Sequence, residues 1–345
     1  MTPRVERLRA LLEEPLLVTD AVNVRYLTGF RSSNAAVLVE PERSRLFADF
    51  RYATAARALA GVEFEQTARS LLGDLSGRLT GRIAFEPEAL SYAGFTTLAA
   101  GGLELVPRSG LVEGLRAVKD SEELASIRRS AAVTDRVFER IAQERFTGRS
   151  ERELAWRMEQ LFHEEGAESL SFPAIVGGGP TGALPHSVPG DRLVGAGETV
   201  VIDAGCVVES YASDCTRTFA AGSLTGRLAD AYAVCLEAQM AGLAAVRAGA
   251  SGSEVDAVAR RIVDGSEFRG TFGHGLGHGV GLQVHEAPTL REESADTLVA
   301  GNVVTVEPGI YLEGLGGIRI EDLVVVEDGG AEVLSQFTKE LVTVS

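Results

Sequence analysis

Histidines gather in one short stretch of the sequence. His274, His278 and His285 lie within twelve residues, in FGHGLGHGVGLQVHE, although the whole chain holds five histidines. The spacing of His274 and His278 would suit one face of a helix, but each of the glycines between residues 273 and 281 would cost such a helix about 1 kcal/mol. An extended or looped segment is expected instead, in which glycines let the backbone approach a ligand or a metal ion. The alternative is that the imidazoles only satisfy hydrogen bonds in the core.

Four acidic residues occur inside otherwise apolar stretches. They are Asp203 in TVVIDAGCVV, Asp214 in YASDCTRTF, Glu307 in TVEPGIY and Glu321 in GIRIEDLVVV. Burying a carboxylate is costly unless it is paired or binds a metal ion. Each acid alone could be an edge-strand or turn residue. Together with the histidines they form an oxygen-rich set that suits divalent cations, to which imidazole adds affinity.

The balance of charge favours two metal ions over one. Four carboxylates carry four negative charges, which two divalent ions would neutralise. Two metal ions roughly 3.5–4 Å apart can share a hydroxide and stabilise the oxygens of a hydrolytic transition state. The residues therefore predict hydrolysis.

The first part of the chain is expected to form a small α/β layer. Residues 16–39 are predicted as short strands separated by turns, and strand-to-helix patterns begin at residues 45 and 81. Strands that alternate with helices over roughly the first 110 residues indicate such a layer. No catalytic motif is evident within it.

The remainder of the chain is expected to be mixed α+β. Asp120 with Glu123, and Ser150 with Glu153, have the spacing of capping boxes that open helices. Further helices are predicted over 228–249 and 253–265, and strands over 171–177, 198–208, 302–311 and 319–328. The predicted organisation is an N-terminal domain over 1–115, a connecting helix within 116–145 and a catalytic domain over 146–345.

Composition excludes several classes of partner. Asp and Glu number 49 against 33 Lys and Arg, a net charge of −16 that would repel a nucleic acid backbone. No uncharged apolar run approaches the ~18 residues that span a bilayer, and the first residues do not resemble a signal peptide. Three cysteines are a poor basis for a disulfide framework, so a cytoplasmic protein is expected.

Five motifs in order resemble those of one enzyme family. They are D-x-G, S-D-x-T-R, G-H-G-x-G-H-x-x-G-L-x-x-H-E, V-E-P-G-I-Y and I-R-I-E-D, between Asp203 and Asp322. The chain is similar here to the pita-bread metallopeptidases, specifically the Xaa-Pro peptidases, prolidase and aminopeptidase P. This resemblance covers most of residues 115–345. N-V-R-Y-L-T-G-F and A-D-F-R-Y resemble the creatinase-like N-terminal domain of the same family.

The resemblance implies a dinuclear metal site. It implies five ligands, with Asp214 and Glu321 bridging the two ions and Asp203 bidentate: Asp203, Asp214, His278, Glu307 and Glu321. A hydroxide that bridges the ions would attack the scissile carbonyl, and Glu307 would take and return the proton. Manganese is the first expectation for both ions, with cobalt, zinc and iron as alternatives.

The resemblance also assigns roles around the metal site. His186, His274 and His285 would line the substrate and stabilise the tetrahedral intermediate. Thr216, Arg217 and Arg319 would fix the orientation of the ligand carboxylates. Phe172 and Tyr211 are expected as wall residues for a proline ring.

The expected substrates are Xaa-Pro dipeptides or short peptides with proline second. A dipeptidase is favoured over an aminopeptidase P, and a non-catalytic peptide-binding protein is a third alternative. Prolidases often carry an arginine for the dipeptide carboxylate where this chain has Thr289, with Arg291 two positions later. Arg31, Arg45 or Arg51 of the N-terminal domain could replace that arginine, with Arg51 as the first choice. Homodimers are expected from the relatives.

Overall fold

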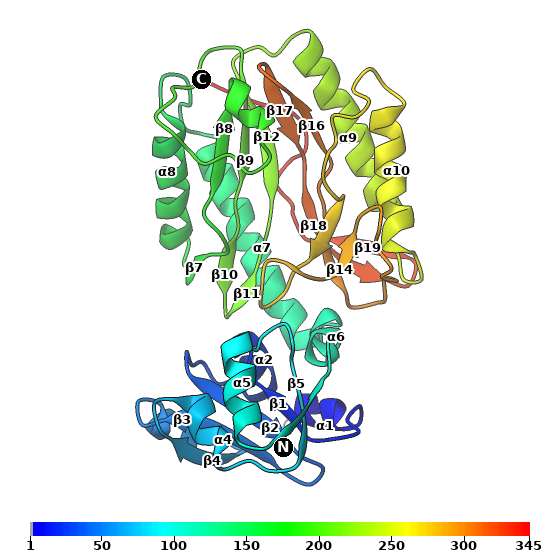
Figure 1. The fold of residues 1–345 in the computed structure, drawn as a ribbon. Helices are drawn as coiled ribbons and strands as arrows, with labels where there is room; N and C mark the ends of the chain where they lie inside the picture. The colour runs from blue at the N-terminus through cyan, green and yellow to red at the C-terminus, as the bar shows by residue number, and fades with distance from the viewer. Residues whose placement is uncertain (1–2) are drawn as a thin grey trace. The chain divides into compact units, whose positions relative to one another are not determined.

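Two compact units make up the part of the chain that the structure describes. The structure is a computed structural model that describes residues 3–345; the first unit ends at Arg116 and the second begins at Ala117 (Figure 1). Both units contain helices and strands, which confirms the expected α+β class. No helix within 3–345 has both the length and the apolar composition that a membrane-spanning helix needs.

A mixed six-stranded sheet forms the centre of the first unit. Its strands are β1 (Leu16–Val18), β2 (Ala35–Val39), β3 (Ser44–Asp49), β4 (Glu63–Thr67), β5 (Arg82–Phe85) and β6 (Glu104–Pro107). They lie in the order β4–β3–β2–β1–β5–β6. The pairs β1–β2 and β2–β3 are antiparallel and the others are parallel. Both β1 and β2 are buried along their whole length, as expected of central strands that are covered on both faces.

Six helices complete the first unit, and one of them corrects the sequence prediction. They are α1 (Pro3–Arg9), α2 (Ala21–Thr28), α3 (Ala53–Arg57), α4 (Leu71–Ser76), α5 (Tyr92–Ala100) and α6 (Leu111–Ala117). Residues 16–39 were predicted as strands and turns throughout, but 21–28 form α2. The Asp20 side chain accepts hydrogen bonds from the first turn of α2, and Gly29 ends the helix with a φ of 74°. Asp20 and Gly29 mark the two ends of α2, but each is a single residue within an alternating apolar pattern that favours strands.

Two larger sheets and two small ones form the second unit. The strands are β7 (Ser169–Leu170), β8 (Ile175–Gly178), β9 (Thr199–Asp203), β10 (Cys206–Val208), β11 (Tyr211–Ala212), β12 (Thr216–Ala221), β13 (Gly277–Gly279), β14 (Glu286–Leu290), β15 (Val303–Val306), β16 (Gly309–Leu312), β17 (Gly316–Arg319), β18 (Asp322–Glu327), β19 (Gly330–Val333) and β20 (Val342–Val344). The larger sheets have the orders β20–β12–β9–β8 and β14–β13–β15–β18–β19. The small ones are β11–β10–β7 and β16–β17. The strand β13 confirms that the glycine-rich histidine segment is extended and not helical.

Two pairs of helices pack beside these strands. They are α7 (Ser121–Ile141) with α8 (Glu151–Glu164), and α9 (Arg227–Ala245) with α10 (Gly252–Asp264), and a short 3₁₀ helix, η1 (Gly179–Ala183), follows β8. Figure 1 shows α8 and the pair α9 and α10 on opposite sides of the strands. Both predicted capping boxes open their helices, at α7 and α8.

Each helix pair shares a hydrophobic core with its strands. Phe138 of α7, Phe162 of α8 and Phe219 of β12 belong to one core, and Cys235 of α9 and Ile318 of β17 to the other. A fully buried side chain of this size contributes about 1.5–3 kcal/mol. The two cores therefore hold rigidly the strands that carry the acidic residues.

Candidate metal centre and substrate cavity

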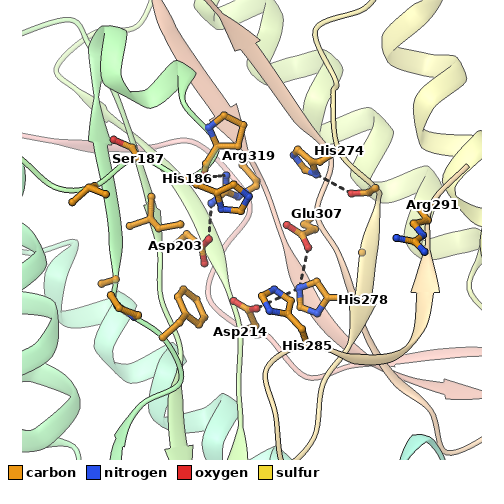
Figure 2. A pocket seen from close by; sticks show the side chains of 18 of the residues that line it. His186, Ser187, Asp203, Asp214, His274, His278, His285, Arg291, Glu307 and Arg319 are labelled. Carbon is orange, nitrogen blue, oxygen red and sulfur yellow. Dashed lines mark hydrogen bonds and ion pairs between the residues drawn. The ribbon is translucent and has the colours of Figure 1, made fainter. Parts of the chain in front are cut away.

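Most of the predicted metal ligands and histidines line one cavity in the second unit, whereas Glu321 lies outside its lining. The cavity has a volume of about 530 Å³. Figure 2 shows the histidines and acids turned toward one another across it. Its acidic, basic and histidine lining residues are Asp203, Asp214, Glu307, His186, His274, His278, His285, Arg291 and Arg319.

The acids stand at the ends of neighbouring strands. Asp203 is the last residue of β9, and Asp214 lies two residues before β12, the antiparallel partner of β9. Glu307 follows β15, and Glu321 lies between β17 and β18. Gly205 permits the tight return from β9, since a Cβ there would overlap the Ser213 carbonyl. The fold thus brings four acids from distant parts of the chain to one place.

Three carboxylates present oxygens that have no partner. One buried oxygen each of Asp203, Asp214 and Glu321 makes no hydrogen bond within the described residues. Asp214, Glu321 and His278 each offer a ligand atom, and these atoms lie within 4.8 Å of one another. Unpartnered buried carboxylate oxygens are costly. Because oxygens of this kind are the ligands that hard divalent cations prefer, the residues fit a metal site.

The pKa shifts of the acids reflect this crowding. Burial and the charge of Glu321 raise the pKa of Asp214 well above its ordinary value. Burial and the charges of Glu307 and Asp203 raise the pKa of Glu321 likewise. Burial opposes ionisation of Glu307 too, but the hydrogen bond and charge of His278 lower its pKa. Full ionisation of this cluster therefore requires added positive charge, which a metal ion provides when it displaces protons.

His278 is oriented with one nitrogen toward the acids. Its Nδ1 lies 3.1 Å from the Gly279 carbonyl oxygen, which fixes the hydrogen on that nitrogen. Its Nε2 lies 3.2 Å from Glu307 Oε1 and 3.7 Å from Asp214 Oδ2. A metal-binding histidine commonly donates its other N–H to a carbonyl in this way.

Arg319 and Thr216 connect two of the acids. Arg319 Nη2 donates to Asp203 Oδ2 at 2.6 Å, and its Nε donates to the Thr216 hydroxyl at 3.0 Å. The Thr216 hydroxyl donates in turn to Glu321 Oε2 at 2.8 Å. Asp203 and Glu321 therefore each have one oxygen held by the protein and one oxygen that is unpartnered.

Arg217 has a different place from the one predicted. Its guanidinium is buried and pairs with Asp322 at 2.8 Å. It also donates to the backbone carbonyls of Glu321, Phe337 and Thr338. No bond from Arg217 reaches a carboxylate of the predicted ligands among the described residues. The alternation of side chains along β12 explains the error, because Thr216 and Arg217 point to opposite faces.

Tyr311 is a site residue that the sequence analysis left without a role. Its hydroxyl lies 2.8 Å from His274 Nε2 and 3.0 Å from Arg319 Nη1. Burial lowers the pKa of His274, and its Nδ1 lies 2.8 Å from the Gly275 carbonyl oxygen, so the neutral ring carries its hydrogen on Nδ1. Arg319 can only donate, so Tyr311 accepts from it and donates to Nε2. Both ring nitrogens of His274 therefore have hydrogen-bond partners. His274 could bind substrate only if one of these two hydrogen bonds were broken.

His186 and His285 also line the cavity. No hydrogen bond joins either ring to another residue in the described part of the chain. The His285 ring packs edge-on against His278, with 4.3 Å between ring centroids, and burial lowers the pKa of His285. Phe172 also lines the cavity, and its role as a wall for the substrate stays a prediction. These side chains can meet a ligand directly.

Tyr211 does not line this cavity. Its hydroxyl donates to the buried Glu123 at 2.7 Å, and its ring belongs to a core shared with Ile127 and Val280. The sequence prediction of a wall residue is therefore wrong. The residue lies close to Asp214 along the chain, but β11 directs its side chain to another part of the unit.

Two of the three candidate arginines of the first unit, Arg45 and Arg51, have carboxylate partners there. Arg45 pairs with Glu40 at 2.9 Å and Glu65 at 3.3 Å. Arg51 pairs with Asp49 at 2.7 Å, and this contact holds the pKa of Asp49 well below its ordinary value. Arg31 is part of the same unit. Their predicted role in holding a substrate carboxylate stays a prediction.

Arg291 contributes a cation from the second unit itself. Its side chain is exposed and lines the cavity, and its guanidinium makes no ion pair or hydrogen bond with another described residue. The turn that carries it is fixed by Thr289, whose hydroxyl donates to Asp296 at 2.9 Å, and by Ser294, which donates to the Thr289 carbonyl at 2.7 Å. Thr289 thus holds the turn that presents Arg291.

Comparisons with known proteins cover both units. The sequence matches the Creatinase/Prolidase N-terminal domain over residues 4–118 and Metallopeptidase family M24 over residues 125–328. It is 35% identical to an uncharacterized peptidase of Bacillus subtilis, over 98% of this chain and 99% of that protein.

Solved structures with two related activities share the fold. The Xaa-Pro dipeptidase from Bacillus anthracis superposes with a TM-score of 0.95 at 35% identity, over 99% of both chains. The X-Pro aminopeptidase from Thermotoga maritima superposes with a TM-score of 0.90 at 31% identity, over 98% of this chain and all of that one. These matches confirm the resemblance drawn from the motifs.

Proposed function

The chain belongs to metallopeptidase family M24, and from this membership we propose that it hydrolyses the peptide bond that precedes a proline residue. The observation that carries the proposal is the set of unpartnered carboxylate oxygens beside His278, inside a cavity of peptide size. Carboxylate oxygens beside an imidazole nitrogen are suitable ligands for divalent cations.

We assign two divalent ions to five side chains. The proposed ligands are Asp203, Asp214, His278, Glu307 and Glu321, with manganese as the first candidate. When bound, the ions would polarise a carbonyl and lower the pKa of water toward neutrality. Thr216 and Arg319 hold the other oxygens of Glu321 and Asp203, so the unpartnered oxygens are already aimed before an ion arrives.

Glu307 is the residue assigned to proton transfer. Its Oε1 accepts a hydrogen bond from the Thr305 hydroxyl at 3.1 Å and lies 3.2 Å from His278. With its pKa lowered it is ionised, so it can take a proton from the attacking water and return it to the leaving amine. The leaving nitrogen belongs to proline, so the scissile bond carries no N–H and needs this proton.

Two histidines are assigned to substrate contact. His186 and His285 face the cavity with ring nitrogens that bond to no other described residue, so either can bind the scissile carbonyl or the leaving imino group. His274 supports Tyr311 and Arg319 at the same wall. Phe172 offers an apolar surface for the proline ring.

A dipeptide is the proposed preferred substrate. Arg319 is committed to Asp203, Thr216 and Tyr311, whereas Arg291 is a cavity cation without a partner among residues 3–345. A guanidinium binds a carboxylate with two parallel hydrogen bonds. The free carboxylate of an Xaa-Pro dipeptide would supply that partner, so Arg291 is the proposed carboxylate-binding residue in place of Arg31, Arg45 or Arg51.

Cleavage of longer peptides is the second candidate function. It is favoured by the similarity to the X-Pro aminopeptidase of Thermotoga maritima, which covers the chain almost as fully as the similarity to the dipeptidase. One experiment separates the two. The protein, loaded with Mn²⁺, is assayed for kcat/KM on Leu-Pro and Leu-Pro-Gly, with an EDTA-stripped sample as the control.

The two candidates predict opposite ratios. We expect metal-dependent cleavage of both peptides, with Leu-Pro preferred. A preference for Leu-Pro-Gly would assign aminopeptidase activity. No metal-dependent cleavage of either peptide would contradict the proposal and leave a peptide-binding role.

A further inference from the structure

A buried carboxylate at the start of α8 contacts both ends of the segment that carries His186. Residues 178–190 are called here the His186 segment. Glu151, which is only 1% exposed, accepts at Oε1 from the backbone N–H of Gly178 at 3.0 Å and from the Thr181 hydroxyl. Its Oε2 accepts from the backbone N–H of Gly190 at 3.1 Å. One side chain therefore connects the two ends of the segment.

The N-terminus of α8 and nearby residues stabilise the Glu151 side chain in its buried position. Glu151 is the first residue of α8, where the helix dipole favours a negative group. The positive charge of Arg192 is close enough to interact with it. The backbone adds two bonds, from Glu151 N–H to the Arg192 carbonyl at 3.1 Å and from Arg152 N–H to the Gly190 carbonyl at 3.0 Å. Glu151 therefore accepts three hydrogen bonds although it is buried.

The two halves of the His186 segment are fixed to different degrees. The first half contains η1, which packs so tightly on β17 that a Cβ on Gly317 would overlap the Gly182 carbonyl. In the middle, the Pro185 carbonyl accepts from Arg319 Nη1 at 3.2 Å. After that point His186 is exposed and Val188 is 87% exposed. The second half is held at Ser187, whose N–H donates to the Leu184 carbonyl at 3.1 Å, and at Gly190, which bonds Glu151 and the N–H of Arg152.

We infer that Glu151 is a positioning residue that fixes where His186 stands in the cavity by holding both ends of the His186 segment. The inference rests on the proposed function insofar as His186 contacts substrate. A displacement of about 1 Å in a substrate-contacting group can lower the rate about a hundredfold. Loss of the Gly190 attachment would permit a displacement of this size.

Glu151→Gln tests the inference, with Glu153→Gln as the matched control. In Glu151→Gln the amide can still accept through oxygen, but its NH₂ group cannot accept from the N–H of Gly190. Glu153 is on the same turn of α8, and its carboxylate accepts from Ser150 N–H at 2.7 Å and not from the segment. Both changes remove one negative charge from one helix turn.

Two kinds of measurement test the effect of these substitutions. Hydrogen exchange of the backbone amides is measured by mass spectrometry on peptides that cover 178–190. The kcat/KM for Leu-Pro is measured in Mn²⁺-loaded enzyme for Glu151→Gln, His186→Ala and the double variant. We expect faster exchange in Glu151→Gln but not in Glu153→Gln, and a loss of about tenfold or more in kcat/KM that is absent when His186 is already alanine.

Each outcome decides a separate claim. Unchanged exchange in Glu151→Gln would overturn the inference. So would equal losses in the presence and absence of His186, because Glu151 would then act on the fold in general. An inactive wild type would contradict the proposed hydrolysis, and the exchange data would still decide whether Glu151 holds the segment.

Discussion

The acidic side chains of this cavity differ in their neighbours, and these neighbours shift the pKa of each carboxylate in a different direction. Glu307 contacts His278 and Thr305 and has a lowered pKa. Asp214 lies farther from His278, at 3.7 Å, and burial with the charge of Glu321 raises its pKa. This difference keeps Glu307, the proposed proton-transfer group, ionised, whereas the negative charge of Asp214 is favoured only when a metal ion binds.

Arg291→Ala tests the proposed recognition of a dipeptide carboxylate. We expect kcat/KM for Leu-Pro to fall by about tenfold to a hundredfold, the cost of losing a hydrogen-bonded charge pair. The rate on Leu-Pro-amide, which lacks the carboxylate, should change little. Steady-state kinetics on both compounds measures the ratio.

Arg51→Ala serves as the comparison for that variant. Arg51 is already paired with Asp49, so the preference for Leu-Pro over its amide should survive in this variant. If Arg51→Ala abolished the preference and Arg291→Ala did not, the carboxylate would be bound by the first unit and the assignment of Arg291 would be wrong.

At the scale of elements, the close packing of β13 against β15 sets the distance between His278 and Glu307. A Cβ on Gly277 would overlap the Thr305 carbonyl and lie 2.9 Å from the Thr305 hydroxyl oxygen. That hydroxyl accepts from the backbone N–H of His278 at 3.1 Å and donates to Glu307. Separation of the strands would disturb both proposed ligands together.

Gly277→Ala is therefore expected to lower both stability and metal content. The free energy of unfolding should fall by about 1–3 kcal/mol, as for other overpacked sites. Urea unfolding and elemental analysis of the purified protein provide the two measurements. Gly273→Ala is the control, because nothing lies within 4 Å of the added Cβ. Equal effects of both substitutions would show that the segment tolerates no side chain anywhere, independent of the strand contact.

The elements that the sequence predicted well have local causes. The capping boxes at Asp120 and Ser150 begin α7 and α8, because a cap involves residues three positions apart. Helix α2 was missed because its signals, Asp20 and Gly29, are weak beside the apolar pattern of its neighbours.

Some residues of the candidate site could be predicted from the sequence, and others could not. The acids and histidines could be predicted because acidic residues in apolar strands are conspicuous. Tyr311 and Glu151 could not, because their bonds to His274 and Gly190 span 37 and 39 residues of the chain and are set by tertiary packing. Tyr211 was misplaced because proximity in sequence to Asp214 does not decide which face of a strand a side chain occupies.

At the scale of the whole molecule, the metal site links stability to pH. The folded-state pKa values of Asp214 and Glu321 lie well above their ordinary values of 3.8 and 4.5. Raised values mean that the folded protein binds more protons than the unfolded chain. Their contribution to stability is then complete below about pH 4 and is lost as pH rises through the folded-state values.

Metal-free protein should therefore lose stability as pH rises above about 4, and bound metal should oppose the loss. Urea unfolding at about pH 5 and about pH 8, with EDTA and with Mn²⁺, measures both effects. The control is metal-free Asp214→Asn, whose stability should fall less between the two pH values. The same slope in this variant and in the wild type would show that other groups cause the pH dependence.

Titration of the metal-free enzyme with Mn²⁺ tests whether two bound ions and Xaa-Pro hydrolysis belong together. Calorimetry gives the number of ions bound, and cleavage of Leu-Pro and Leu-Ala is assayed at each step. We expect two ions per chain, cleavage of Leu-Pro that rises only as the sites fill, and little cleavage of Leu-Ala. Full occupancy without cleavage of Leu-Pro, or cleavage that EDTA does not abolish, would contradict the proposed function.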